Sequence, residues 1–192
     1  MATLTTHKRM TQEEFRRMPE GPPYYELEQG ELILVPSPKN RHQTLLALLF
    51  TAVYQFVTQH NLGIVTMEVD VYFPDGNVYI PDMAFLGNAR RDLLDPTDDK
   101  IHGVPDLAVE LLSEDRARDR VRKARVYLAN GVEWRWIVDP NCLTIEEYQA
   151  TPEGYVLVAA VDVGEAFHPR LFAGLTLDLA ALLGETPPAS QA

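Results

Sequence analysis

A single carboxylate inside an apolar run is the most informative feature of this sequence. Glu110 lies within the segment Leu107–Leu112, whose other residues are all apolar. A buried carboxylate is costly unless an electropositive partner holds it. Asp82 interrupts a second apolar segment upstream, and Lys123 lies in a helix-like segment downstream. Two carboxylates and a lysine that converge on one point predict metal-dependent hydrolysis of a phosphodiester.

This chemistry assigns a role to each residue type. Mg²⁺ held by carboxylate oxygens activates a water molecule and neutralises charge on the phosphate, and Mn²⁺ is a possible substitute. Asp82 and Glu110 are therefore the candidate metal ligands. Lys123 is the candidate point charge that orients the attacking water or stabilises the transition state. In the predicted strand 106–112, alternation places Glu110 on the face opposite Leu107, Val109 and Leu111.

Each of these residues also has a purely structural explanation. Asp119 lies four residues before Lys123 and can form an ordinary surface ion pair with it on a helix. Asp82 can cap a turn. Glu110 can be the buried partner of a nearby arginine. The sequence pattern leaves these alternatives open.

Composition excludes several classes of protein. With 192 residues and 46% hydrophobic residues, the chain suits one domain with its own core. We expect this domain to span residues 10–184, with flexible tails at 1–9 and 185–192. No apolar stretch is long enough to span a bilayer, which predicts a cytoplasmic protein without membrane partners. Cys142 is the only cysteine, so a metal site must use oxygen or histidine ligands.

The formal net charge of −11 opposes binding to nucleic acid, because phosphate binding depends on Lys and Arg. The distribution of charge weakens this objection. Basic residues concentrate in one segment, Arg116–Arg125, while acidic residues gather elsewhere. A solvated helix face is the alternative explanation of that basic segment.

The order of predicted elements places the candidate residues in one core. A capping box at Thr11–Glu14 begins a short helix, and a buried helix begins near Asn40. Two strands joined by a Pro-Asp-Gly-Asn turn follow at 65–73 and 78–86. The buried strand 106–112, a helix over 115–130 that ends at Gly131, and the strand 134–138 complete the core. The order is helix, three strands, helix, strand, with a further hairpin at 143–161.

Several motifs together resemble a known family. They are Pro81-Asp82, the segment Pro105–Ser113, Asp119 with Lys123 and Tyr127, and the segment Gly131–Pro140. The match continues upstream in Tyr25–Leu32 and in Pro36-Ser37-Pro38 with His42. In these positions the chain resembles the bacterial putative restriction endonuclease family of the PD-(D/E)xK nuclease superfamily, over roughly residues 11–183.

The resemblance implies an α/β fold with a restriction-endonuclease-like αβββαβ core, in which helices flank a mixed central sheet and extra β-hairpins are added. It implies that Asp82 and Glu110 bind the metal ion, that Lys123 is the catalytic lysine, and that Glu26 is a further acidic member of the site. An exposed charge on an edge strand is the structural alternative for Glu26. For His42, capping or packing is the alternative to a role as a ligand.

The function implied is that of a Mg²⁺-dependent endonuclease acting on DNA. A homodimer is expected, because cutting both strands requires two sites related by symmetry. A non-catalytic domain that keeps the fold and binds nucleic acid or protein is the main alternative, and hydrolysis of small phosphoesters is a third.

Overall fold

The computed structural model describes residues 9–113, 115 and 117–186. Across these residues the strands form two six-stranded sheets, each of them mixed. The predicted tails 1–9 and 185–192 lie largely outside the described residues. Among the helices of the described ranges, none is both long and apolar enough to cross a bilayer.

The central sheet carries the predicted core. Its strands follow the order β12-β11-β10-β9-β6-β3, and only β9 and β10 run parallel. Their bounds are β3 (Gly63–Met67), β6 (Met83–Gly87), β9 (Leu107–Leu111), β10 (Trp134–Asp139), β11 (Thr144–Thr151) and β12 (Gly154–Val161). With the helices α2 (Asn40–Gln59) and α3 (Lys123–Asn130), the order α2-β3-β6-β9-α3-β10 confirms the predicted αβββαβ core.

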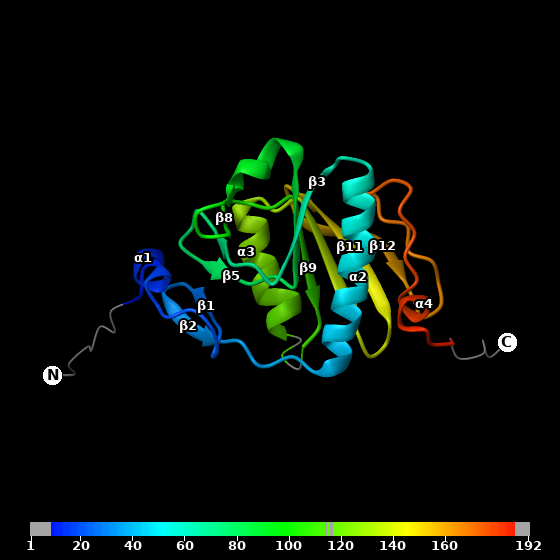
Figure 1. The fold of residues 1–192 in the computed structure, drawn as a ribbon, viewed down its shortest axis with the longest axis horizontal. Helices are drawn as coiled ribbons and strands as arrows, with labels where there is room; N and C mark the ends of the chain where they lie inside the picture. Colours follow the sequence, from blue (N-terminus) through cyan, green and yellow to red (C-terminus); the bar gives the residue numbers. More distant parts are fainter. Residues whose placement is uncertain (1–8, 114, 116, 187–192) are drawn as a thin grey trace.

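The two long helices cover opposite faces of the central sheet (Figure 1). The apolar stripe of α2 packs against the face that carries Leu107, Val109 and Leu111. The other face, which carries Ala108, packs against Tyr127 of α3. Alternation along β9 therefore directs Glu110 toward α3, as the pattern predicted. Gly131 ends α3 in the left-handed conformation, with φ of 84°.

A second sheet lies on the α3 side and has the order β2-β1-β5-β4-β8-β7. Its strands are β1 (Tyr25–Glu28), β2 (Glu31–Leu34), β4 (Val71–Tyr72), β5 (Val78–Tyr79), β7 (Leu94–Asp95) and β8 (Lys100–His102). Short helical segments accompany the sheets: α1 (Gln12–Arg16), η1 (Asn88–Leu93) and α4 (Leu179–Leu183). The capping box predicted at Thr11 is confirmed.

The predicted strands 65–73 and 78–86 are each divided between the two sheets. β3 and β6 pair in the central sheet, whereas β4 and β5 pair in the second sheet. The chain leaves β3 at Glu68, which has a φ of 52°, and Pro81 interrupts the segment between β5 and β6. Asp82 therefore lies at the junction of the two sheets rather than within a continuous strand.

The helix predicted over 115–130 begins with a turn of π-helix, η2 (Arg118–Arg122). The wider turn changes which side chains face the sheet, and Val121 within it is 46% exposed. Glu114 and Arg116 of the same region lie outside the described residues.

Candidate active site

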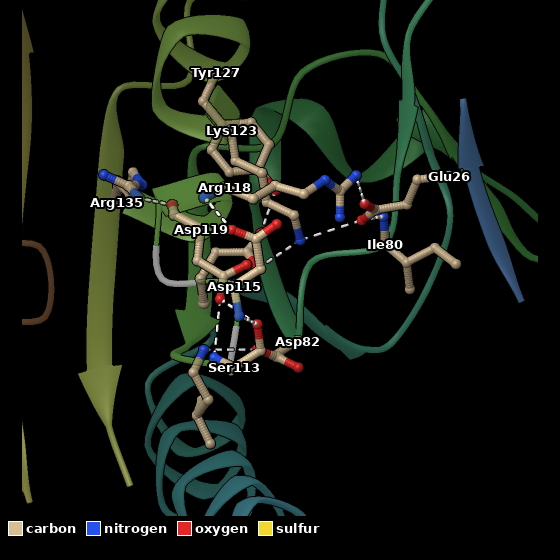
Figure 2. A network of polar contacts seen from close by, with 12 residues as sticks. Glu26, Ile80, Asp82, Ser113, Asp115, Arg118, Asp119, Lys123, Tyr127 and Arg135 are labelled. Atoms are coloured by element: carbon tan, nitrogen blue, oxygen red, sulfur yellow. Dashed lines mark hydrogen bonds and ion pairs between the residues drawn. The ribbon is translucent and has the colours of Figure 1, made fainter. Parts of the chain in front are cut away.

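Asp82 is oriented toward the end of β9 by a backbone hydrogen bond. The N–H of Leu111 donates to its Oδ2 at 2.6 Å, so the carboxylate lies beside the residue that follows Glu110. The side chain of Asp82 is 16% exposed, and it lies near Ser113 at the lower end of the network in Figure 2. Asp82 thus approaches the candidate site from the junction of the sheets.

Glu110 is almost completely buried, with 2% of its surface exposed. Lys123 Nζ donates to its Oε2 at 2.7 Å, and the Tyr127 hydroxyl donates to its Oε1. Burial disfavours the charged carboxylate and, despite the attraction of Lys123, raises the pKa of Glu110 to about 7. The ion pair predicted as an alternative for Glu110 therefore exists, and its partner is the candidate catalytic lysine rather than an arginine.

Lys123 lies between two carboxylates from different sheets. Its Nζ is 2.7 Å from Glu110 Oε2 and 3.1 Å from Glu26 Oε1 (Figure 2). Only 5% of the residue is exposed. Burial opposes its positive charge, but the two carboxylates outweigh this effect and raise the pKa of Lys123. The lysine is therefore held in the charged form inside the protein.

Glu26 is not an exposed charge on an edge strand. It is 1% exposed, and its strand β1 lies between β2 and β5. The N–H of Ile80 donates to Oε1 at 2.9 Å, and Arg118 Nη2 donates to Oε2. Burial opposes the charge of Glu26, but Lys123 and Arg118 outweigh this effect and lower the pKa of the carboxylate.

His42 extends the network at its more open side. Its Nε2 lies 3.4 Å from Asp82 Oδ1. Burial works against a charged imidazole, but the contact with Asp82 outweighs it and raises the pKa of His42. His42 therefore contacts Asp82, a candidate metal ligand. A residue that only capped the start of α2 would not need this contact.

The basic segment does not form one continuous surface. Arg118 is buried against Glu26, and Arg120 pairs with Glu146, whereas Arg122 and Arg125 are exposed. Arg116 lies outside the described residues. Within the described part of this segment, Arg122 and Arg125 are therefore the arginines that present charge to solvent.

Two residues of the network were missed as site residues. The sequence pattern presents Arg118 as one charge in a basic run, and Tyr127 belongs to the family motifs without a role in the site. The spacing of four residues between Lys123 and Tyr127 was a usable signal, because it places both side chains on one side of an α-helix. Asp119 does not serve as the surface partner of the lysine, since its carboxylate accepts from the backbone and hydroxyl of Ser113.

The oxygen donors of Asp82 and Glu110 fit a magnesium ion. Mg²⁺ is commonly held by one or two carboxylates, with water and substrate phosphate completing its coordination. The oxygens of both carboxylates accept hydrogen bonds, and each retains a further lone pair. These two residues are therefore chemically suited to hold the ion.

A separate cluster of possible metal ligands occurs in the second sheet. Donor atoms of Asp95, Asp98 and His102 lie within 4.8 Å of one another, among the residues described. His102 Nε2 is 2.9 Å from Asp98, and its ring stacks on Tyr72. These contacts account for the arrangement as a polar surface cluster.

The mixed central sheet with α2 and α3 on its opposite faces has the restriction-endonuclease-like α/β fold. The model of the family described as Uma2, putative restriction endonuclease, matches residues 12–180, and the chain belongs to this family. The family membership and the fold confirm the resemblance inferred from the motifs.

A solved structure is similar over nearly the whole chain. It is a putative nuclease belonging to DUF820 from Anabaena variabilis ATCC 29413, with a TM-score of 0.71 and 22% identity. The match covers 91% of this chain and 98% of that chain, and it supports the fold. The comparison with curated proteins finds no match.

Proposed function

We propose that this protein is a metal-dependent nuclease that hydrolyses phosphodiester bonds of DNA. One observation carries the proposal: the buried Lys123 Nζ lies 2.7 Å from Glu110 Oε2, and Asp82 accepts a hydrogen bond from the N–H of the next residue, Leu111. Family membership supports the same reaction class. Charged groups fixed in a buried site are suited to stabilising charge that develops in a transition state.

Asp82 and Glu110 would hold Mg²⁺, or Mn²⁺ in its place. When bound, the ion supplies neutralisation of the phosphate and a lowered pKa for the attacking water. Asp82 is the more exposed of the two carboxylates, whereas Glu110 lies deeper, against Lys123 and Tyr127. Substrate would therefore reach the site from the side of Asp82 and His42.

Lys123 holds a positive charge at Nζ and keeps its protons through two carboxylate partners. Its role would be to orient the reacting water or a phosphate oxygen while the surrounding side chains exclude bulk solvent. The Tyr127 hydroxyl fixes the other oxygen of Glu110, which limits rotation of that carboxylate. This arrangement keeps the charged groups in place before substrate binds.

The exposed residues Arg122 and Arg125 would supply positive charge close to the site, on a chain with net charge −11. Cleavage of both strands of a duplex would require a homodimer with two such sites. We propose that the reaction takes place in the cytoplasm.

The test is a cleavage assay on plasmid, linear duplex and single-stranded DNA, and on RNA, with Mg²⁺, with Mn²⁺ and with EDTA. Wild type should cleave DNA only with metal, and Lys123→Met should lose at least ~100-fold in kcat. Lys100→Met is the matched control, because Lys100 also pairs with a carboxylate, 2.9 Å away on Asp70. Cleavage that survives EDTA, or that Lys123→Met retains in full, would overturn the proposal.

A second candidate is a non-catalytic binding domain that keeps the fold. The hydrogen bonds that both oxygens of Glu110 accept favour it, because a structural ion pair would have the same partners. Binding of DNA without cleavage in any metal, with unchanged binding in Lys123→Met, would select this candidate.

A further inference from the structure

We propose that Arg118 is a positioning residue for Lys123 and that it acts through the carboxylate of Glu26. The inference rests on the proposed function, since it deepens the role of the same site. Nothing in the basic pattern of the sequence separates Arg118 from its neighbours. Its contacts in the structure do.

Arg118 is a buried cation directed into the network. Its Nη2 donates to Glu26 Oε2, and the same atom is 3.7 Å from Glu28 Oε2. The guanidinium carbon lies 5.8 Å from the ring centroid of Tyr79. Figure 2 shows Arg118 and Lys123 both pointing toward Glu26. The arginine therefore does not present its charge to solvent as a surface residue would.

Glu26 divides its oxygens among three donors. Oε2 accepts from Arg118, while Oε1 accepts from the N–H of Ile80 and lies 3.1 Å from Lys123 Nζ. Without Arg118, Oε2 would be a buried acceptor deprived of its donor, and the carboxylate would be free to turn toward the lysine. The carboxylate of Glu26 contacts both cations. Loss of Arg118 at Oε2 should therefore shift Oε1 and with it the position of Lys123.

The π-helical turn places the two cations on one side. The N–H of Lys123 donates to the carbonyl of Arg118, five residues earlier, as a π-turn requires. In a regular α-helix, side chains five residues apart differ in direction by about 140°. Arg135 Nη2 donates to the carbonyl of Asp119 within the same turn. The turn and its arginine contact therefore favour the geometry in which both Arg118 and Lys123 reach Glu26.

Arg120 supplies a matched comparison from the same turn. It makes two hydrogen bonds to the carboxylate of Glu146, at 2.8 and 3.2 Å. Like Arg118, Arg120 lies in η2 and forms an ion pair with a glutamate on a strand. The glutamate that pairs with Arg120 lies on β11, whereas Glu26 lies on β1. Replacing Arg120 thus removes an arginine–carboxylate pair without altering Glu26.

The kinetic experiment compares Arg118→Gln with Arg120→Gln in the metal-dependent cleavage of DNA. Arg118→Gln should lower kcat by about 10- to 100-fold with KM changed less than ~3-fold, because a displaced lysine affects the transition state more than binding. Arg120→Gln should stay within ~2-fold of wild type. Equal losses in the two variants would overturn the proposal.

A double variant separates positioning from folding. Glu26→Gln/Arg118→Gln removes both charges, so it leaves neither partner as an unpaired buried ion. Its melting temperature should recover toward wild type relative to Arg118→Gln, while kcat should remain low because the carboxylate that contacts Lys123 is gone. Recovery of kcat together with the melting temperature would show a structural role only.

A readout that needs no activity follows the lysine itself. In ¹⁵N-labelled protein without metal, the Lys123 ammonium should give an NMR signal protected by its two carboxylate contacts, assigned by its loss in Lys123→Met. Arg118→Gln should shift or broaden this signal, and Arg120→Gln should not. An unchanged signal in Arg118→Gln would overturn the positioning role even if wild type proved inactive. Absence of cleavage by wild type, with the signal shifted, would instead overturn the proposed function alone.

Discussion

Lys123 Nζ lies 2.7 Å from Glu110 Oε2, although thirteen residues and a change from strand to helix separate the two. Glu26, from a different sheet, contacts the same ammonium at 3.1 Å. The lysine thus joins three segments of the chain. Loss of one of these charges should affect stability as well as activity.

Lys123→Met should destabilise the protein, because the change leaves Glu110 and Glu26 without their common cation. A surface lysine would contribute little, but removal of one partner from a buried pair costs about 3–5 kcal/mol. The loss should be smaller at pH 5, where Glu110 is protonated, since its pKa is raised to about 7. Urea unfolding at pH 5 and pH 8 measures both values. A cost below ~1 kcal/mol at pH 8 would indicate a solvated lysine.

Glu110→Gln should change how the stability of the metal-free protein depends on pH. Burial raises the pKa of Glu110 from 4.5 to about 7. The contribution of this carboxyl group to the free energy of unfolding is therefore fully present below pH 4.5 and is lost as pH rises through 7. The free energy of unfolding of wild type minus that of Glu110→Gln should therefore fall over this window. Urea titrations in EDTA test the difference. A gap that is constant with pH would contradict the raised pKa.

Metal binding should stabilise wild type and depend on Asp82. At a free ion concentration 100 times Kd, binding adds about 2.7 kcal/mol to the free energy of unfolding. Asp82→Asn and Glu110→Gln should lose this increment, which is read as the rise in melting temperature with Mn²⁺ or Mg²⁺. Asp106→Asn is the control, because the Asp106 carboxylate accepts a hydrogen bond from the N–H of Gly87 and is not a candidate metal ligand. A wild-type melting temperature indifferent to both ions would leave Glu110 as a structural ion-pair partner.

Charge reversal of the exposed arginines should weaken DNA binding without affecting the network. In Arg122→Glu/Arg125→Glu, the slope of log K against log salt should become shallower by about 0.9 for each phosphate that the protein no longer neutralises. Fluorescence anisotropy at several salt concentrations measures this slope. Arg17→Glu is the comparison, since Arg17 is exposed on another segment and pairs locally with Glu13. Equal slopes in both variants and wild type would assign Arg122 and Arg125 to an ordinary solvated surface.

The sequence determined the core through local patterns that reflect short-range physics. The helical spacing after Asn40, the apolar alternation around Glu110 and the glycine at 131 each predicted an element that the structure contains. Alternation along β9 also determined which face Glu110 would occupy. The family motifs agreed with this order of elements, and they are what singled out Glu26.

Tertiary structure decided everything that depends on contacts between distant segments. The division of 65–73 and 78–86 between two sheets follows from breaks at Glu68 and Pro81. The local sequence of both segments favours continuous strands, so it does not predict these breaks. Within the π-turn, the carbonyl of Asp119 accepts from Arg135, a contact across space that no local pattern reports.

The apolar run indicated the burial of Glu110, whereas no local pattern indicated the burial of Glu26 and Arg118. Glu26 and Arg118 lie 92 residues apart and resemble ordinary surface residues by type. The cost of burying each charge is offset by the other and, for Glu26, by Lys123 as well. Sequence patterns report the periodicity of neighbours along the chain, whereas compensation between buried charges is set by distance in the folded protein.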